Sequence, residues 1–148
     1  MKRVLAVLLL AAACSSGAPA PASLDTKNEW CRWCRMAVSD ARFASQLVAP
    51  NEEPKFFDDL GCLGHYVAGS QALPPGTAAF VADHRTKAWA PASAAVYTRV
   101  AGLETPMGSQ LMAHADAASR EADPDAKGGT PAAAAEVFGA TGAPAGTR

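Results

Sequence analysis

The stretch EWCRWCRMAVSD, residues 29–40, concentrates residue types that the rest of the chain uses sparingly. It contains two of the four cysteines, two of the three tryptophans and one of the four methionines. On a strand, residues two apart point to the same face, so an extended segment would place the thiol of Cys34 beside the thioether of Met36. Both groups are soft ligands, which favour Cu(I) over magnesium, calcium or manganese. The stretch therefore predicts a strand that carries two copper ligands.

The residues that follow predict a β-hairpin and a helix. Residues 35–39 and 44–50 are strand-like, and NEEPK at 51–55 is typical of a turn. The apolar positions beyond this turn recur on one helical face, and either Asp58 or Asp59 is suited to cap that helix. The first half of the chain thus predicts a ββα unit.

The second half predicts the same pattern. Its strand-like segments are residues 77–84, 87–90 and 94–100. Thr105 is a natural N-cap with Pro106 at the first helical position, and Met107, Leu111 and Ala115 recur at a spacing of four. Two hairpin–helix units packed together make one small α+β domain. Residues 28–122 are a suitable length for it.

The N-terminus has the pattern of an export signal. Residues 1–13, MKRVLAVLLLAAA, combine a basic start with an apolar run that is too short to span a bilayer. A cysteine directly after the small residues resembles a bacterial lipoprotein signal, so we expect cleavage before Cys14 and a lipid on that residue. Residues 14–27 would then be a flexible tether, and the protein would face the periplasm on a membrane anchor.

The C-terminal residues 123–148 are rich in Ala, Gly and Pro, and they contain few large apolar side chains. Such a segment buries too little surface to offset the entropy of ordering, so we expect it to be mostly disordered, with a short helix near 131–138 as an alternative.

The composition and charge of the chain argue against several classes of protein. The chain has 148 residues, of which 18% are charged, and a net charge of −1. This balance, without a basic stripe, argues against nucleic acid as a partner. No segment after the signal is long and apolar enough to cross a membrane. Because no motif places a nucleophile beside a general base, we do not expect an enzyme.

One more sulfur would complete a Cu(I) site, and Met107 occupies the matching place in the second half. The two halves would then close over one ion bound by Cys34, Met36 and Met107. The number of cysteines agrees with a free ligand thiol. Acylation of Cys14 leaves an odd number of thiols in an oxidising compartment, so at least one of them cannot be paired within the chain. A disulfide between Cys31 and Cys62 would leave Cys34 free for metal, although other pairings stay open.

A zinc site is the alternative interpretation of the same residues. Cys31 and Cys34, followed by Cys62 and His65, make a four-ligand set with zinc-like spacing. Such a domain would be a structural zinc module that acts in protein interactions. Free cysteine pairs are less suited to an exported protein, and this set leaves the methionines unexplained. We expect the other two histidines to be solvated, His84 in a turn and His114 on a helix.

The motifs together resemble the NosL family, accessory lipoproteins of nitrous oxide reductase. The resemblance runs from about Glu29 to Ala118 through WCRWCRM, KFFDDLGCLGHY and TPMGSQLMA. It implies two ββα units related to the treble clef, a Cu(I) site, and delivery of copper to the reductase or a related copper enzyme outside the cytoplasm. The family's Cys-x-Met pair falls on Cys34 and Met36, and the methionine of its TPMG motif falls on Met107. The family form has glycine where this chain has Arg35, which on a strand would face away from the ligands.

Overall fold

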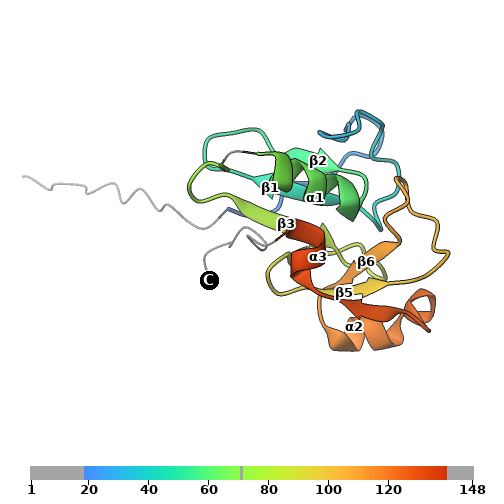
Figure 1. Ribbon diagram of the computed structural model, residues 1–148. Coiled ribbons are helices and arrows are strands. Elements are labelled where there is room, and N and C mark those ends of the chain that lie inside the picture. Colours follow the sequence, from blue (N-terminus) through green and yellow to red (C-terminus); the bar gives the residue numbers. More distant parts are fainter. Residues whose placement is uncertain (1–18, 71, 140–148) are drawn as a thin grey trace, which may run out of the picture.

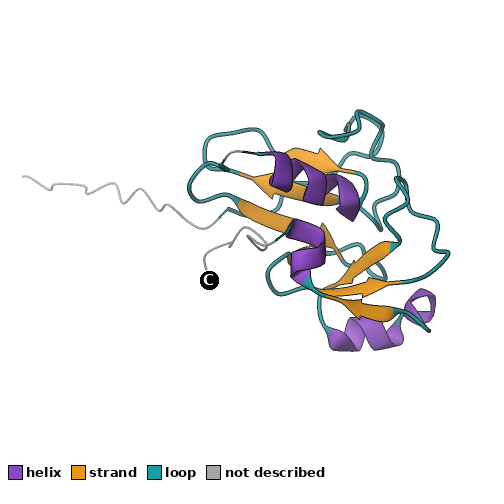
Figure 2. Ribbon diagram, viewed as in Figure 1, coloured by secondary structure: helices purple, strands orange, loops and turns teal. Residues whose placement is uncertain are grey.

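The computed structural model describes residues 19–70 and 72–139, so the expected signal and the acylation of Cys14 lie outside the described residues. The described chain is a mixed α/β fold in which two small antiparallel sheets are accompanied by short helices (Figures 1 and 2). In chain order, the elements are β1 (Ser45–Val48), β2 (Lys55–Phe57), α1 (Leu60–Gly69), β3 (Ala78–Ala82), β4 (Trp89–Pro91), β5 (Val96–Arg99), β6 (Leu111–His114), α2 (Ala117–Ala122), the 3-10 turn η1 (Pro124–Ala126), β7 (Thr130–Ala132) and α3 (Ala134–Phe138). Among the described residues, no helix is both long and apolar enough to span a bilayer.

The first sheet has the strand order β2-β1-β3-β4. β1 pairs antiparallel with β2 across the turn at 49–54, and every residue of β3 is buried at the centre of the sheet. α1 packs Leu60 and Leu63 against this layer, where Phe57 is fully buried. The strands predicted at 44–50, 77–84 and 87–90, the turn at 51–55 and the following helix are all confirmed.

The second sheet has the order β6-β5-β7, and it joins the first at one corner. The amide of His84, just after β3, donates to the carbonyl of Ala113 in β6 at 2.8 Å. The carboxylate of Asp83 accepts from the amide of Ala115 at 2.8 Å. These bonds fix the corner where the two sheets meet.

The expected pairing of two equivalent ββα units is only partly matched. A hairpin followed by a helix occurs twice, as β1–β2–α1 and β5–β6–α2, but only one strand of each hairpin, β1 and β5, was expected. The strand predicted at 35–39 is wrong, since only one isolated bridge, between Trp30 and Ala37, forms there. The treble-clef arrangement is therefore not confirmed, whereas the α+β class is.

The helix predicted from Thr105 is also wrong. Residues 105–110 form a loop, and Leu111 starts strand β6. Gly108 and Gln110 adopt positive φ angles of 74° and 59°, which a right-handed helix excludes. The fourfold spacing of Met107, Leu111 and Ala115 therefore spans a loop, a strand and its exit.

The C-terminal segment is folded as far as residue 139, contrary to the expected disorder. η1, β7 and α3 follow one another there, and Val137 and Phe138 are buried in the core. The helix considered at 131–138 corresponds to α3, which packs on α1. The fold also extends beyond Asn28 at the N-terminal side, because the side chain of Gln46 hydrogen bonds both backbone groups of Ala22.

Packing of α3 on α1 depends on a glycine. A Cβ added at Gly64 would overlap the carbonyl oxygen of Val137. We therefore expect Gly64→Ala to lower the free energy of unfolding by about 1–3 kcal/mol, as overpacking does, despite the higher helix propensity of alanine. Urea unfolding measures the change.

Gly69→Ala is the matched control for this substitution. An added Cβ there meets only Trp33, at an ordinary contact distance of 3.8 Å. Its stability should stay within about 1 kcal/mol of the wild type. Equal stabilities for the two variants would contradict the packing of α3 on α1.

Candidate metal centre

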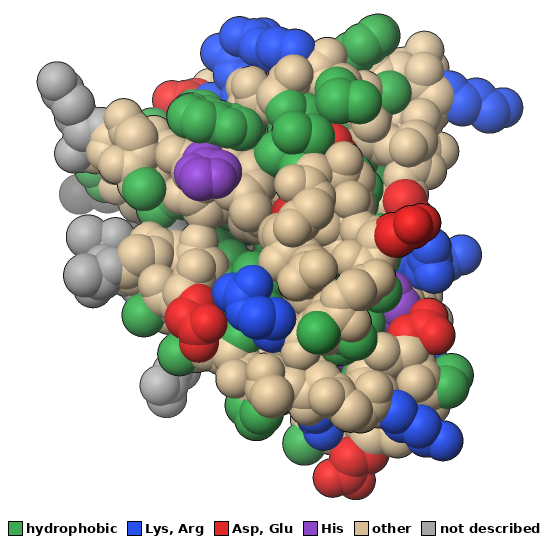
Figure 3. All heavy atoms as spheres, turned by 45° about the vertical axis from the view of Figure 1, so that its right-hand side comes forward, with side chains coloured by type: hydrophobic (Ala, Val, Ile, Leu, Met, Phe, Trp, Pro, Cys, Tyr) green, Lys and Arg blue, Asp and Glu red, His purple; other side chains and the backbone are tan. Residues whose placement is uncertain are grey.

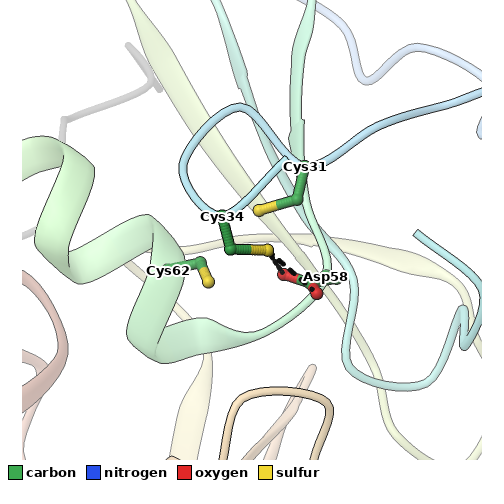
Figure 4. Close-up of side chains that lie close together, drawn as sticks. All are labelled: Cys31, Cys34, Asp58 and Cys62. Atoms are coloured by element: carbon green, nitrogen blue, oxygen red, sulfur yellow. Dashed lines mark hydrogen bonds between the residues drawn. The ribbon is translucent and has the colours of Figure 1, made fainter. Parts of the chain in front are cut away.

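Three thiols and one carboxylate converge beside the start of α1, and we call Cys31, Cys34, Cys62 and Asp58 the thiol cluster. Their ligand atoms all lie within 4.8 Å of one another (Figure 4). The Sγ of Cys34 lies 3.5 and 3.4 Å from the two carboxylate oxygens of Asp58. Cys31, Cys62 and Asp58 are buried, whereas Cys34 is partly exposed. The cluster therefore has a closed side and an open side.

A tight turn presents the first two cysteines. The amide of Cys31 donates to the carbonyl of Met36 at 2.8 Å, and the amide of Arg35 donates to the carbonyl of Cys31 at 3.1 Å. Arg35 has a φ of 67°, in the left-handed region that glycine adopts without strain. Arg35 therefore occupies an exposed turn position, and the strand on which it was expected to face away from the ligands is wrong.

The same turn separates Cys34 from Met36. The thiol of Cys34 points into the thiol cluster, whereas the side chain of Met36 is 56% exposed. The argument that both project from one strand face does not hold, because the segment is not a strand. A hydrogen bond of 2.8 Å from the amide of Arg32 to the carbonyl of Phe56 docks the turn against β2, close to Asp58.

The third cysteine is placed by the helix cap. Asp59 is the N-cap of α1 and accepts from the amide of Gly61 at 2.6 Å, so Cys62 lies in the first turn of the helix. Since Asp59 performs the capping, the adjacent Asp58 is free to face the thiols. From the sequence, either aspartate was considered only as a helix cap and this role was missed, although the doubled aspartate before a cysteine was its visible signal.

Asp59 also holds the loop that carries Met107. Its Oδ2 accepts from the Thr105 hydroxyl at 2.6 Å and from the amide of Met107 at 3.0 Å. Burial raises the pKa of Asp59, but hydrogen bonds from Ser109, Thr105 and the backbone outweigh it, and the pKa lies below its usual value of 3.8. One carboxylate thus joins two segments 48 residues apart.

Replacing Asp59 with Ala is expected to cost about 2 kcal/mol of unfolding free energy, near the upper end for a lost N-cap. The wild type should also lose stability in acid. A carboxyl whose folded pKa is depressed contributes fully above its unfolded pKa, near 3.8, and loses that contribution as the pH falls through the folded value. Urea unfolding at pH 7 and pH 3 should show a smaller difference for Asp59→Ala than for the wild type. The exposed Glu53→Ala is the control, and an identical pH dependence in all three proteins would contradict this role.

The thiols of the cluster influence one another's protonation. A hydrogen bond from Cys62 lowers the pKa of Cys31 to about 6, whereas burial raises the pKa of Cys34 to about 11. The hydrogen bond to Cys31 raises the pKa of Cys62. Cys31 is therefore the thiol of the cluster that loses its proton most readily, and a bound cation would displace the protons of the other two. All three cysteines are free thiols in the structure.

An apolar rim lies beside the cluster. Trp33 and Met107, which line a pocket together with Cys62, are 48% and 47% exposed, and Trp30, which directly precedes Cys31, is 65% exposed. On the face of the molecule drawn in Figure 3, hydrophobic side chains gather in the upper part, near a histidine. A pocket of about 300 Å³ reaches the cluster at Cys62, and it is lined by Trp33, Gly61, Cys62, His65, Met107, Gly108 and Ser109.

The structure thus brings together part of each predicted ligand set. Cys31, Cys34 and Cys62 meet, whereas His65 stays outside the cluster, exposed and stacked on Trp33 with ring centroids 5.6 Å apart. Met107 shares the pocket with Cys62. The expectation that His84 and His114 are solvated is wrong, because both are buried.

Comparison with family models gives a match to the NosL model over residues 21–140. No curated protein and no solved structure matches the chain significantly.

Proposed function

This chain belongs to the NosL family, and from this premise we propose that it is an accessory protein that binds Cu(I) outside the cytoplasm and passes it to a copper enzyme. Family membership indicates a copper-binding protein associated with a copper-dependent system such as nitrous oxide reductase. The observation that carries the proposal is the convergence of three thiols in the thiol cluster.

The donor set suits monovalent copper. Thiolates are soft ligands that select Cu(I), and three of them can surround one ion. In the proposal, Cys31, Cys34 and Cys62 hold the ion, and before the metal binds Asp58 orients the sulfur of Cys34 by accepting the hydrogen bond of its thiol. The buried side of the cluster shields the ion from water, and Cys34 gives access to it.

The methionines then serve copper transfer. Met36 and Met107 are exposed thioethers, which are neutral soft ligands. We assign them to the rim of the site, where each can bind the ion transiently with Cys34 while it moves to the partner. Resting coordination by Cys34, Met36 and Met107, with Cys31 and Cys62 oxidised, is the competing assignment.

The apolar rim suits the docking of the recipient enzyme. Exposed tryptophans and methionines that adjoin a metal site mark a surface for protein contact. Nitrous oxide reductase is the first recipient to test, because the family is associated with that enzyme. Catalysis forms no part of the proposal.

Anchoring to a membrane is proposed from the sequence alone. The signal-like residues 1–13 and Cys14 support export and acylation, with the protein facing the periplasm. Since Ala22 is bonded to β1, the tether would span residues 14–21 rather than 14–27.

A structural zinc site is the second candidate, and one observation favours it. Three cysteines and one carboxylate supply the four ligands that structural zinc sites use. Asp58 would then replace His65 of the predicted set. In that case the metal would stabilise the fold and would not be transferred.

Metal displacement in the reduced protein separates the two functions. The chain is loaded with zinc under anaerobic conditions and then receives one equivalent of Cu(I). The copper proposal predicts that zinc leaves the thiol cluster and that the copper afterwards passes to a copper-free acceptor protein. Retention of zinc by the cysteines, with Cu(I) left in solution, would support the zinc module instead.

A further inference from the structure

A second group of potential ligands lies in the core, at the corner where the two sheets meet. His84, His114 and Asp123, which we call the imidazole cluster, are 3%, 0% and 3% exposed. Nδ1 of His84 lies 2.7 Å and Nε2 of His114 lies 2.9 Å from the same carboxylate oxygen, Oδ2 of Asp123. Two imidazoles and one carboxylate therefore meet at a single point.

Each member of the imidazole cluster comes from a different segment. His84 follows β3, His114 ends β6, and Asp123 joins α2 to η1. The other oxygen of Asp123 accepts from the amide of Asp125 at 2.9 Å, which caps η1. The backbone bond from His84 to Ala113 fixes the spacing of the two histidine segments. The three groups are thus positioned before any ligand arrives.

The imidazole cluster contains ring nitrogens without a hydrogen-bond partner and a carboxylate without a Lys or Arg partner. Nε2 of His84 and Nδ1 of His114 are buried without a hydrogen-bond partner among the described residues. Within the same part of the chain, no Lys or Arg forms an ion pair with Asp123. A divalent cation at the point of convergence would neutralise this buried carboxylate and bind the two ring nitrogens that now contact it, whereas the unpartnered nitrogen on the other side of each ring would stay without a partner.

We propose that the imidazole cluster is a second metal site, which binds a divalent transition-metal ion of the zinc class through Nδ1 of His84, Nε2 of His114 and Oδ2 of Asp123. Imidazole and carboxylate suit Zn²⁺ and Co²⁺, whereas thiolates select Cu(I). The chain therefore has two sites that differ in ligand softness, and the second does not depend on the proposed copper function.

The geometry requires only a small adjustment to take the ion. Ligand atoms on one tetrahedral zinc ion lie roughly 3.3 Å apart, from metal–ligand distances of about 2.0–2.1 Å. Each ring therefore has to move by a few tenths of an ångström. Binding would join the turn after β3 to β6 and to the C-terminal segment, so the bound metal should stabilise the contact between the two sheets.

Cobalt titration of the reduced full-length chain tests the proposal, because Co²⁺ reports its ligands in its spectrum. We expect two binding phases, one with the intense near-ultraviolet bands of sulfur coordination and one with weak visible bands alone. Asp123→Asn should weaken the second phase at least tenfold and leave the sulfur phase unchanged. Cys34→Ser should do the reverse.

Asp125→Asn is the matched control, since it makes the same substitution at an exposed position two residues away and should leave both phases unchanged. If Asp123→Asn fails to fold by circular dichroism, His84→Gln takes its place. As a second measurement, Zn²⁺ should raise the melting temperature of Cys34→Ser by several degrees. A wild type with only the sulfur phase, or a second phase that survives Asp123→Asn and His84→Gln, would overturn the proposal.

Discussion

Cys34→Ser is expected to lower the affinity for Cu(I) by at least about 100-fold, because it removes a thiolate from the thiol cluster. Loss of groups outside the coordination sphere already costs roughly 10–100-fold in metal affinity, so loss of a ligand should cost more. Anaerobic competition with a chromogenic Cu(I) chelator measures the change. Cys62→Ser should have a similar effect, since both sulfurs lie within 4.8 Å of the others in the cluster.

Met36→Leu and Met107→Leu are the matched controls for this prediction. Both replace an exposed thioether by an apolar side chain of similar volume, so the fold should tolerate them. We expect the equilibrium affinity to stay within about threefold and the rate of transfer to an acceptor to fall. If both methionine variants bind as weakly as Cys34→Ser while Cys62→Ser binds normally, the ion is held by Cys34, Met36 and Met107 instead.

Phe138→Ala is expected to lower the free energy of unfolding by about 3–5 kcal/mol, the usual range for a large aromatic removed from a core. Phe138 is fully buried, and its ring meets that of Tyr97 edge to face at a centroid distance of 6.0 Å. For a domain of this size, the melting temperature should fall by roughly 10 °C or more. Thermal unfolding monitored by circular dichroism measures this change.

Lys127→Ala controls for substitution within the same C-terminal segment. Its side chain is exposed, so the stability should change by less than about 0.5 kcal/mol. If Phe138→Ala and Lys127→Ala unfold at the same temperature, the C-terminal segment does not belong to the core. The disorder expected from its composition would then be correct.

Local pattern predicted the strands and the helix that lie in the core. β1, β3, β4, β5 and α1 all stand where alternation, apolar runs and a capping aspartate indicated. The predictions fail where contacts between residues that are far apart in the sequence determine the backbone conformation. The amide of Met107 bonds to Asp59, 48 residues away, and no window around Thr105 contains that partner. The composition of residues 123–148 likewise gives no sign that their one aromatic, Phe138, is buried and that the described residues 123–139 are folded.

The sequence predicted that sulfur ligands form the candidate site, but it did not predict which residues come together there. Only the zinc alternative placed Cys31, Cys34 and Cys62 in one site. The preferred copper set combined Cys34 with the two methionines. The role of Asp58 beside the thiols could not be predicted, because either Asp58 or Asp59 satisfies the pattern of a helix cap. His84 lies in a polar stretch that resembles a surface turn, and His114 lies in the segment that was predicted as a helix. Only the contact between His84, just after β3, and β6 shows that both histidines are buried.

X-ray absorption at the copper edge of the Cu(I)-loaded protein tests the central claim most directly. We predict a first shell of three sulfur atoms in the wild type, which falls to two in Cys62→Ser and stays at three in Met107→Leu. A first shell dominated by nitrogen or oxygen, or one that Cys62→Ser leaves unchanged, would contradict binding of copper by the thiol cluster.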